Sequence, residues 1–543
     1  MPNGSRVTAK KYQWARAGDV NAFFGLMLDN VAGLLLAVSL LAVLFEFPTQ
    51  FALQYMVPGT AIGVLVGDLL FFWLAFRLAR STGSNTVTAM PLGLDTPSTF
   101  GMVFFVLGPA FTVAKTTMSV DQAALHTWHI GICAIFLSGV FKSACAFGSN
   151  WIRRLIPRAG LLGSLAAIAL VLISFLPLVE ILHTPIIGLI ALSIVLTSLI
   201  GRIRMPGNLP GTLVALIVAG TMFHIMNWMG WLDSQAPLIA PHEALMPTGW
   251  TTVFHFEWLD AFGETMRYLP VILPFALATV VGGIDCTESA AAVGDEYDTR
   301  LIVAGEGIAT LVASLCGGVI QTTPYIGHPA YKAMGGRAAY TLATALFIGS
   351  AGVFGFFAYL YVIIPKAAVF PILVFIGLEI TSQSFQATPK RHYPAVALAC
   401  IPALAYLALI YADKVIGENN IQLSPALGEE IQTLRILSNG YIVTSLLWAS
   451  TLAAIIDRRL RTTAIFLLIT AICALFGVIH SPLAGSPMYL PWQLDSHPFE
   501  LVIRYVTGYL LAALILLGLH YYTKAFTPPN AEADSTNHAE AHT

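Results

Sequence analysis

Charged residues are scarce in this chain. Only 10% of its 543 residues are Asp, Glu, Lys or Arg, whereas 57% are hydrophobic. Soluble proteins carry roughly 25% charged residues, and disordered chains are more polar still. Both classes are therefore excluded. The composition indicates a polytopic helical membrane protein whose first partner is the lipid bilayer.

The chain also lacks the features of several functional classes. Its net charge of −2 provides no basic field for nucleic acid. The six cysteines lie in apolar stretches without metal-ligand spacing. No phosphate-binding loop, HExxH motif or Ser-His-Asp order stands out. These absences argue against an ATP-driven pump and a membrane hydrolase. We therefore expect no enzyme activity, no metal site and no cofactor beyond a coupling proton or Na+.

Long apolar runs dominate what is present. A helix needs about 20 apolar residues to cross the hydrocarbon core. Sixteen candidate spans, numbered here in chain order, lie near 21–45, 53–79, 89–110, 125–148, 159–182, 185–202, 209–229, 268–292, 301–318, 319–337, 339–363, 367–387, 393–411, 438–457, 463–480 and 501–522.

The distribution of basic residues predicts the orientation. With a cytoplasmic N-terminus, 21 of the 27 Lys and Arg residues, Lys142 among them, fall on the inner side and 6 on the outer side. The positive-inside rule requires this bias. We therefore predict an inner-membrane protein with both termini in the cytoplasm. The two long connections, 230–266 and 412–437, would face outward.

Two of the spans are interrupted by prolines. Span 3 contains AMPLGLDTPSTFGM (89–102), and span 10 contains TTPYIGHPAYKAMGG (322–336). A proline removes a helical hydrogen bond and biases the preceding residue toward extended structure, but it is favoured at the first helical position. Each segment therefore predicts a short extended piece, followed by a half-helix that starts near Pro97 or Pro329.

The interrupted spans occupy matching positions. Span 3 is third among spans 1 to 7, and span 10 is third among spans 8 to 14, so the second set would run inverted. Interrupted segments at corresponding positions of two halves indicate a transporter's binding site. We predict an all-α, seven-plus-seven inverted-repeat transporter with two extra C-terminal spans; two ordinary Pro-kinked helices are the alternative. The residues expected at the half-helix caps are Asp95 or Thr96, and His328.

Polar residues within the spans are few, and such residues mark functional sites because their burial is costly. They are Asp29, Asn30, Asp68, Asp95, Asp285, Glu288, Glu306, His328 and Glu379. Spans 1, 3, 8 and 10 would form the centre of an inverted-repeat core. The residues ranked highest on this basis are Asp95, Asp285, Glu288 and His328.

Each of these residues also has a structural interpretation. Asp95 would then only cap its half-helix, and His328 would be a satisfied interior histidine. Glu288 would lie near the inner surface. The remaining acids of spans 2, 9 and 12 are more often interhelical hydrogen-bond partners. Two aromatic residues, Phe100 and Tyr325, lie beside the breaks, where a ring could stack on a planar solute.

The motifs at the breaks resemble a known family, the xanthine/uracil/vitamin C permease superfamily, and most closely its adenine–guanine–hypoxanthine branch. MPLGLDTPSTF (90–100) is similar to the branch's Pro-Gly-Met-Gly-Leu-Asn stretch. Asp285 precedes a small-residue run, as in an Asp-Thr-Ala-Gly-Thr stretch. TTPYIGHPAYKAMGGR (322–337) is similar to a Thr-Thr-Thr-Tyr-(Val/Ile)-Glu-Ser…Gly-Gly-Arg pattern, and is the most specific match.

The resemblance implies a core domain, a gate domain and proton- or cation-coupled uptake of a planar nucleobase between spans 3, 8 and 10. The chain departs from the family at four positions. Asp95 replaces an asparagine, Gly327 a glutamate and His328 a serine. Val281 stands where the uracil-type branch has a glutamate. These changes put acceptance of a purine in doubt.

The predicted segments are a cytoplasmic N-terminal segment (1–20), the first core half (21–148), the first gate half (149–229), an extracytoplasmic loop (230–266), the second core half (267–363), the second gate half (364–457), the extra spans (458–523) and a disordered cytoplasmic tail (524–543). The expected partners are a small-molecule solute and a second copy in a homodimer, not nucleic acid.

We therefore predict a secondary active permease for a nucleobase-like solute. The predicted substrate-binding residues are Asp95, Thr96, Phe100, Asp285, Glu288, Tyr325, Gly327 and His328. The predicted coupling residues are Asp285, Glu288 and Asp95. An anion transporter of the sulfate, bicarbonate or carboxylate kind, with the same fold, is the first alternative. It would need a fixed positive charge near the breaks, and Lys332 lies too far inward. A non-transporting membrane enzyme or sensor is the second.

Overall fold

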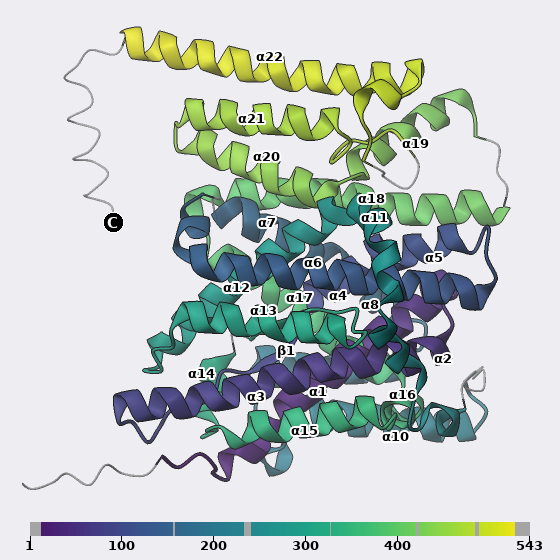
Figure 1. Ribbon diagram of the computed structural model, residues 1–543, viewed down its shortest axis with the longest axis vertical. Coiled ribbons are helices and arrows are strands. Elements are labelled where there is room, and N and C mark those ends of the chain that lie inside the picture. The colour runs from purple at the N-terminus through teal and green to yellow at the C-terminus, as the bar shows by residue number, and fades with distance from the viewer. Residues whose placement is uncertain are drawn as a thin grey trace, which may run out of the picture. The chain divides into compact units, whose positions relative to one another are not determined.

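The computed structural model (Figure 1) describes residues 12–155, 158–232, 240–325, 327–419, 423–483 and 488–526. The chain forms two compact units. The first comprises Met1–Leu155 and Ile168–Ser382, and the second comprises Ile156–Ala167 and Gln383–Thr543. These boundaries do not coincide with the predicted core and gate segments, and that division stays a prediction. The first eleven residues and the predicted tail from residue 527 onward lie outside the described residues.

The helices follow the apolar runs. Those of the first unit are α1 (Gly18–Phe45), α2 (Thr49–Phe51), α3 (Val57–Thr82), α4 (Thr96–Met102), α5 (Gly108–Ala114), α6 (Val120–Leu155), α8 (Phe175–Ile181), α9 (Pro185–Val195), α10 (Gly211–Trp228), α11 (Phe262–Thr265), α12 (Leu269–Ala292), α13 (Thr299–Leu315), α14 (His328–Ala333), α15 (Ala339–Val353), α16 (Phe357–Ile363) and most of α17 (Lys366–Gln386). The second unit holds most of α7 (Arg158–Ile168), and α18 (Tyr393–Asn419), α19 (Pro425–Ser438), α20 (Tyr441–Ile456), α21 (Leu460–Leu475) and α22 (Ser496–Phe526).

Most of the predicted spans are present as apolar helices. Among the described residues, ten helices are long and apolar enough to cross a membrane, and two bent pairs raise the number to 12. One bent pair, α15 with α16, turns by 91° within span 11. The other four predicted spans correspond to shorter helices or to the break in span 10. The chain is therefore an integral, polytopic helical membrane protein, and the predicted fold class is confirmed.

Three predicted boundaries are wrong. The connection 230–266 ends in 3₁₀ turns and α11, and the helical span that contains α12 begins at Glu257, not near 268, where Trp258 is buried. The connection 412–437 contains the end of α18 and most of α19, which begins at a Ser424 cap followed by proline. Helix α22 continues to Phe526, past the predicted start of the tail.

The extended pieces predicted at the two breaks are present and pair with each other. Strand β1 (Leu92–Leu94) runs antiparallel to β2 (Thr322–Pro324), with Gly93 opposite Thr323. Two further backbone bonds flank the pair, from Tyr325 N to Pro91 O (2.9 Å) and from Asp95 N to Gln321 O (3.0 Å). Non-helical backbone at membrane depth requires such internal partners, since lipid offers none.

Four helices enclose this two-stranded crossing. Helices α1 and α3 contact β1, and helices α12 and α13 contact β2. The approach of α3 to α13 depends on small residues: a Cβ atom on Gly63 would lie 2.5 Å from the Cβ of Ala313. Small residues allow helix backbones to approach closely in membranes. The crossing is consequently buried inside the first unit, where the interruption of both spans is tolerated.

The second unit is built mainly on small apolar contacts. Helices α18 and α20 pack through a cluster that includes Ala395, Ala399, Ala449 and Ala453. Helix α21 packs on α20 and α22 packs on α21, so the two extra C-terminal spans extend this layer (Figure 1). His480, just after α21, bonds the Tyr509 hydroxyl of α22 (2.8 Å), which also accepts from Trp448 Nε1 (2.9 Å).

Candidate functional site

Asp95 links β1 to the half-helix that follows. It is the N-cap of α4, and its carboxylate Oδ2 accepts a hydrogen bond from Ser98 N (2.9 Å). The capping predicted for Asp95 or Thr96 is thus confirmed at Asp95. Helix α4 continues through a π-helical turn into α5, giving one span from Thr96 to Ala114. A buried carboxylate (Asp95 is 7% exposed) therefore occupies the positive end of a 19-residue helix.

The second break is capped differently from the prediction. Gly327, not His328, is the N-cap of α14, and no side chain caps this helix. His328 is the first helical residue, and its Nε2 lies 2.9 Å from Asp295 Oδ2. Lys332 Nζ lies 2.7 Å from Asp295 Oδ1. His328 and Lys332 are therefore turned toward a common acid in the loop between α12 and α13.

A buried ion pair that the sequence did not reveal lies next to the crossing. Lys142 of α6 and Glu306 of α13 are both fully buried, with Lys142 Nζ 2.7 Å from Glu306 Oε1. The same ammonium donates to the Thr322 carbonyl of β2 (2.7 Å) and lies 3.4 Å from the Thr310 hydroxyl. A buried charge requires this kind of pairing and hydrogen bonding. Thr322 pairs with Leu94 of β1, which directly precedes Asp95.

The assignment of Lys142 to the cytoplasmic side is wrong, because its side chain is fully buried. Its position inside predicted span 4, and not in a connecting loop, is the feature of the sequence that indicates burial. The buried ammonium supplies the fixed positive charge near the breaks that the anion alternative requires. Lys332, the residue considered for this role, is instead paired with Asp295.

The side chains of α1 and α3 complete the polar surroundings of β1. Asn30 Oδ1 accepts from Leu94 N (3.1 Å). Asp68 is fully buried, and its carboxylate faces the backbone of Leu92 in β1. The β1 side of the crossing therefore faces an amide and a carboxylate from two different helices.

The two predicted aromatic residues are both packed into the structure. Tyr325 donates its hydroxyl to the Leu94 carbonyl (3.2 Å), and its ring lies against Gly93. Phe100 is fully buried and stacks on Phe104, with ring centroids 6.0 Å apart. Phe275 packs on the same helix at Gly101. These contacts account for both rings within the protein, and their contact with a solute stays a prediction.

The two predicted acids of α12 differ in exposure. Asp285 is half-buried, whereas Glu288 is exposed. Cys286, between them, is the residue that faces the crossing, because its thiol lies 3.3 Å from the Pro324 carbonyl. Thr96 and Gly327 are half-buried at the starts of their half-helices. The solute and coupling roles assigned to these residues stay predictions.

The fold and the crossing define a class of protein: a polytopic helical membrane protein in which two interrupted spans meet through a pair of short strands. No protein-family model and no curated protein matches the chain. Similar solved structures include the transmembrane domain of a cyanobacterium bicarbonate transporter BicA, which is 15% identical, with 80% of this chain and 97% of that chain covered and a TM-score of 0.44.

Two further solved structures are similar to this chain at lower sequence identity. The overall structure of SLC26A9 is 12% identical, with 72% of this chain and 61% of that chain covered and a TM-score of 0.48. The murine Solute Carrier 26 family member A9 anion transporter in the inward-facing state is 12% identical, with 75% and 69% covered and a TM-score of 0.41.

The resemblance to the nucleobase permeases is therefore corrected, because the structures found are of bicarbonate and anion transporters. The residues that departed from the permease motifs agree with this correction. Gly327 offers no carboxylate to a purine N–H group, and Asp95 is engaged as a helix cap. Short motifs around prolines reflect the local geometry of an interrupted span and do not by themselves identify a family.

Proposed function

We propose that the chain is a secondary transporter that moves a small anion together with a proton, at the crossing of β1 and β2. The observation that carries this proposal is the placement of Asp95. Its carboxylate lies on the N-terminus of α4, one residue after Leu94, which pairs with Thr322, and the Thr322 carbonyl accepts from the buried Lys142 ammonium. Interrupted spans of this kind form the solute sites of many transporters.

The N-terminus of α4 supports an anionic solute. Its first-turn N–H groups bind negative charge, and Ser98 N now donates to Asp95 Oδ2. A bicarbonate or a small monocarboxylate has the same planar pair of oxygens as the Asp95 side chain. Such a solute can take the place of that carboxylate once Asp95 is neutral or turned away. The Lys142 ammonium adds a positive charge on the β2 side.

The charge balance of the site supports coupling to a proton. Asp95 and Glu306 each carry one negative charge when ionised, and Lys142 carries one positive charge, so these three groups sum to −1 in the empty site. The buried Asp68 carboxylate contributes equally to the empty and the loaded form. A proton on Asp95 and a bound monovalent anion leave this total unchanged. The empty and loaded forms therefore face similar electrostatic costs inside the membrane, whereas the anion alone would bring the total to −2.

Uptake into proteoliposomes tests this function. Purified protein is reconstituted, the outside is made acidic, and the accumulation of labelled bicarbonate, acetate and sulfate is measured with and without the pH gradient. We expect the gradient to drive accumulation of at least one monovalent anion above the level in protein-free liposomes, into which neutral acetic acid and CO₂ diffuse unaided. Intact protein that accumulates none of these anions would refute the proposal.

Replacing Asp95 with asparagine separates its charge from its capping role. Asparagine caps helices as well as aspartate does, so the D95N variant should fold and lose only the charge and the proton site. We expect its gradient-driven accumulation to fall to the level of protein-free liposomes. The matched control is D298N, because Asp298 is an exposed N-cap that accepts from Arg300 N (2.9 Å). Equal accumulation by D95N and the unsubstituted protein would contradict the assignment.

A further inference from the structure

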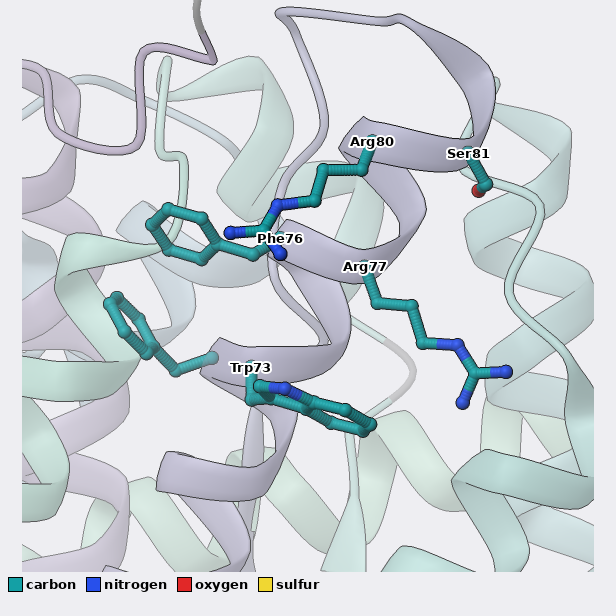
Figure 2. A pocket seen from close by; sticks show the side chains of 6 residues that line it. Trp73, Phe76, Arg77, Arg80 and Ser81 are labelled. Atoms are coloured by element: carbon teal, nitrogen blue, oxygen red, sulfur yellow. The ribbon is translucent and has the colours of Figure 1, made fainter.

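A pocket of about 560 Å³ lies on the C-terminal part of α3, away from the crossing (Figure 2). It is lined by Phe72, Trp73, Phe76, Arg77, Arg80 and Ser81. Three of these residues are aromatic and two are cationic, so one surface combines an apolar and a positively charged part.

The pocket residues form two adjacent rows along the helix. Residues four apart lie one above the other on an α-helix, so Trp73 lies below Arg77 and Phe76 lies below Arg80 (Figure 2). The guanidinium carbon of Arg77 lies 5.7 Å from the centre of the Trp73 ring, within the range of a cation–π contact. In both rows the aromatic residue is nearer the middle of the helix and the arginine nearer its end.

The N-terminal segment packs against the same aromatic residues. The Trp14 ring meets Phe72 edge-on, with centroids 6.0 Å apart, and the Tyr12 ring meets Phe76 at 5.0 Å. The Tyr12 hydroxyl donates to the Val87 carbonyl (2.8 Å), which fixes this segment beside α3. The contacts of Tyr12 and Trp14 therefore fix the positions of the aromatic residues in the pocket.

The depth of the pocket matches the edge of the bilayer. Asp68 lies in α3 next to Gly67, which packs against Leu92 of β1, so this point of the helix is level with the crossing. At about 1.5 Å per residue, Arg77 lies roughly 14 Å and Arg80 roughly 18 Å farther along the helix. Half of the hydrocarbon core is about 15 Å. The arginines consequently reach the headgroup region, where aromatic side chains also concentrate.

The two arginines have no acidic partner. Neither Arg77 nor Arg80 forms an ion pair or a hydrogen bond with any residue that the structure describes, and both side chains are exposed. Trp73 is 53% exposed, which is unfavourable for a tryptophan in water but suits contact with acyl chains. The exposed surface is thus complementary to a molecule that is anionic at one end and apolar below it.

We propose that this pocket binds an anionic phospholipid of the adjoining leaflet. The phosphate lies between Arg77 and Arg80, which suit phosphate oxygens because a guanidinium presents paired donors. Ser81 borders the headgroup, and the acyl chains lie along Trp73 and Phe76. Basic pockets at the headgroup level are a general site of lipid recognition. The proposal goes beyond solute transport and does not depend on which solute the crossing binds.

Thermal unfolding of the purified full-length protein in neutral detergent tests the lipid site. Dioctanoyl phosphatidylglycerol, dioctanoyl phosphatidylcholine and inorganic phosphate are titrated separately. We expect saturable stabilisation by phosphatidylglycerol only, because a ligand that binds the folded state raises stability. For the R77Q/R80Q variant, the concentration needed for half of the effect should rise about thirtyfold.

The matched control is R202Q/R204Q, because these two arginines are also exposed and close together. It should leave the titration unchanged. Three results would each overturn the lipid site: phosphatidylcholine stabilises the protein as much as phosphatidylglycerol does, inorganic phosphate does so, or the control variant loses as much of the stabilisation as R77Q/R80Q. If R77Q/R80Q fails to fold, a second measurement tests the site. Quenching of tryptophan fluorescence by brominated phosphatidylglycerol is compared between the unsubstituted protein and W73F. A saturable component that W73F removes supports the site, and its absence overturns it.

Discussion

Removing the Lys142 ammonium should leave Glu306 buried without a counter-charge. Both side chains are fully buried, and their charged atoms are 2.7 Å apart. Deleting one partner of a buried pair costs about 3–5 kcal/mol, because the remaining charge stays desolvated. We expect K142M and E306M each to lower the free energy of unfolding by about 4 kcal/mol. For K142M, the loss includes the bond to the Thr322 carbonyl.

The double variant K142M/E306M should recover most of this loss. Two well-packed apolar side chains replace a buried ion pair at little net cost. The expected cost of the double variant is below about 2 kcal/mol, so the coupling energy of the cycle exceeds about 6 kcal/mol. The double variant should nevertheless transport poorly, because the positive charge beside β2 is gone.

Reversible unfolding in mixed detergent micelles, followed by circular dichroism, measures this cycle. The control cycle uses Arg435 and Asp413, whose charged atoms are also 2.7 Å apart but whose side chains are 28% and 50% exposed. An exposed pair should show a coupling below about 1 kcal/mol. Coupling of that size at Lys142 and Glu306 would refute the reasoning, because it would mean that water reaches the pair.

Two further changes test the packing of each unit. In G93A, the added Cβ would overlap the Tyr325 hydroxyl, so we expect a loss of about 1–3 kcal/mol in unfolding free energy together with reduced uptake. The control G282A, where a Cβ meets nothing within 4 Å, should change neither stability nor uptake. Equal effects of the two variants would contradict the close fit at β1. In Y509F, the bonds to His480 and Trp448 are lost, which should cost about 2 kcal/mol in thermal or denaturant unfolding, and an unchanged stability would contradict this network.

The sequence predicted the layout of the helices well because hydropathy depends only on local composition. The breaks at Pro97 and Pro329 were also predictable, since proline acts on its own neighbours. The capping by Asp95 follows from the same local chemistry. These features require no knowledge of how distant segments meet.

Features that depend on distant contacts were missed. Nothing local indicates that β1 pairs with β2, because about 230 residues separate them. The Lys142–Glu306 pair was missed because charge counting assigns every lysine to a loop. Hydropathy did not detect α19, since its composition is polar and its bend from α20 is 73°. The family resemblance failed because it depended on short motifs around prolines.

The pairing of β1 with β2 has a mechanical consequence. The strands and their flanking bonds, Tyr325 N to Pro91 O and Asp95 N to Gln321 O, join the two interrupted spans through the backbone. Breaking such bonds at membrane depth costs several kcal/mol for each group left unsatisfied. In the transport cycle proposed above, the two interrupted spans should therefore move as one body. A solute bound at the crossing would then be exposed to each side by movement of this body as a whole, not by separation of its halves.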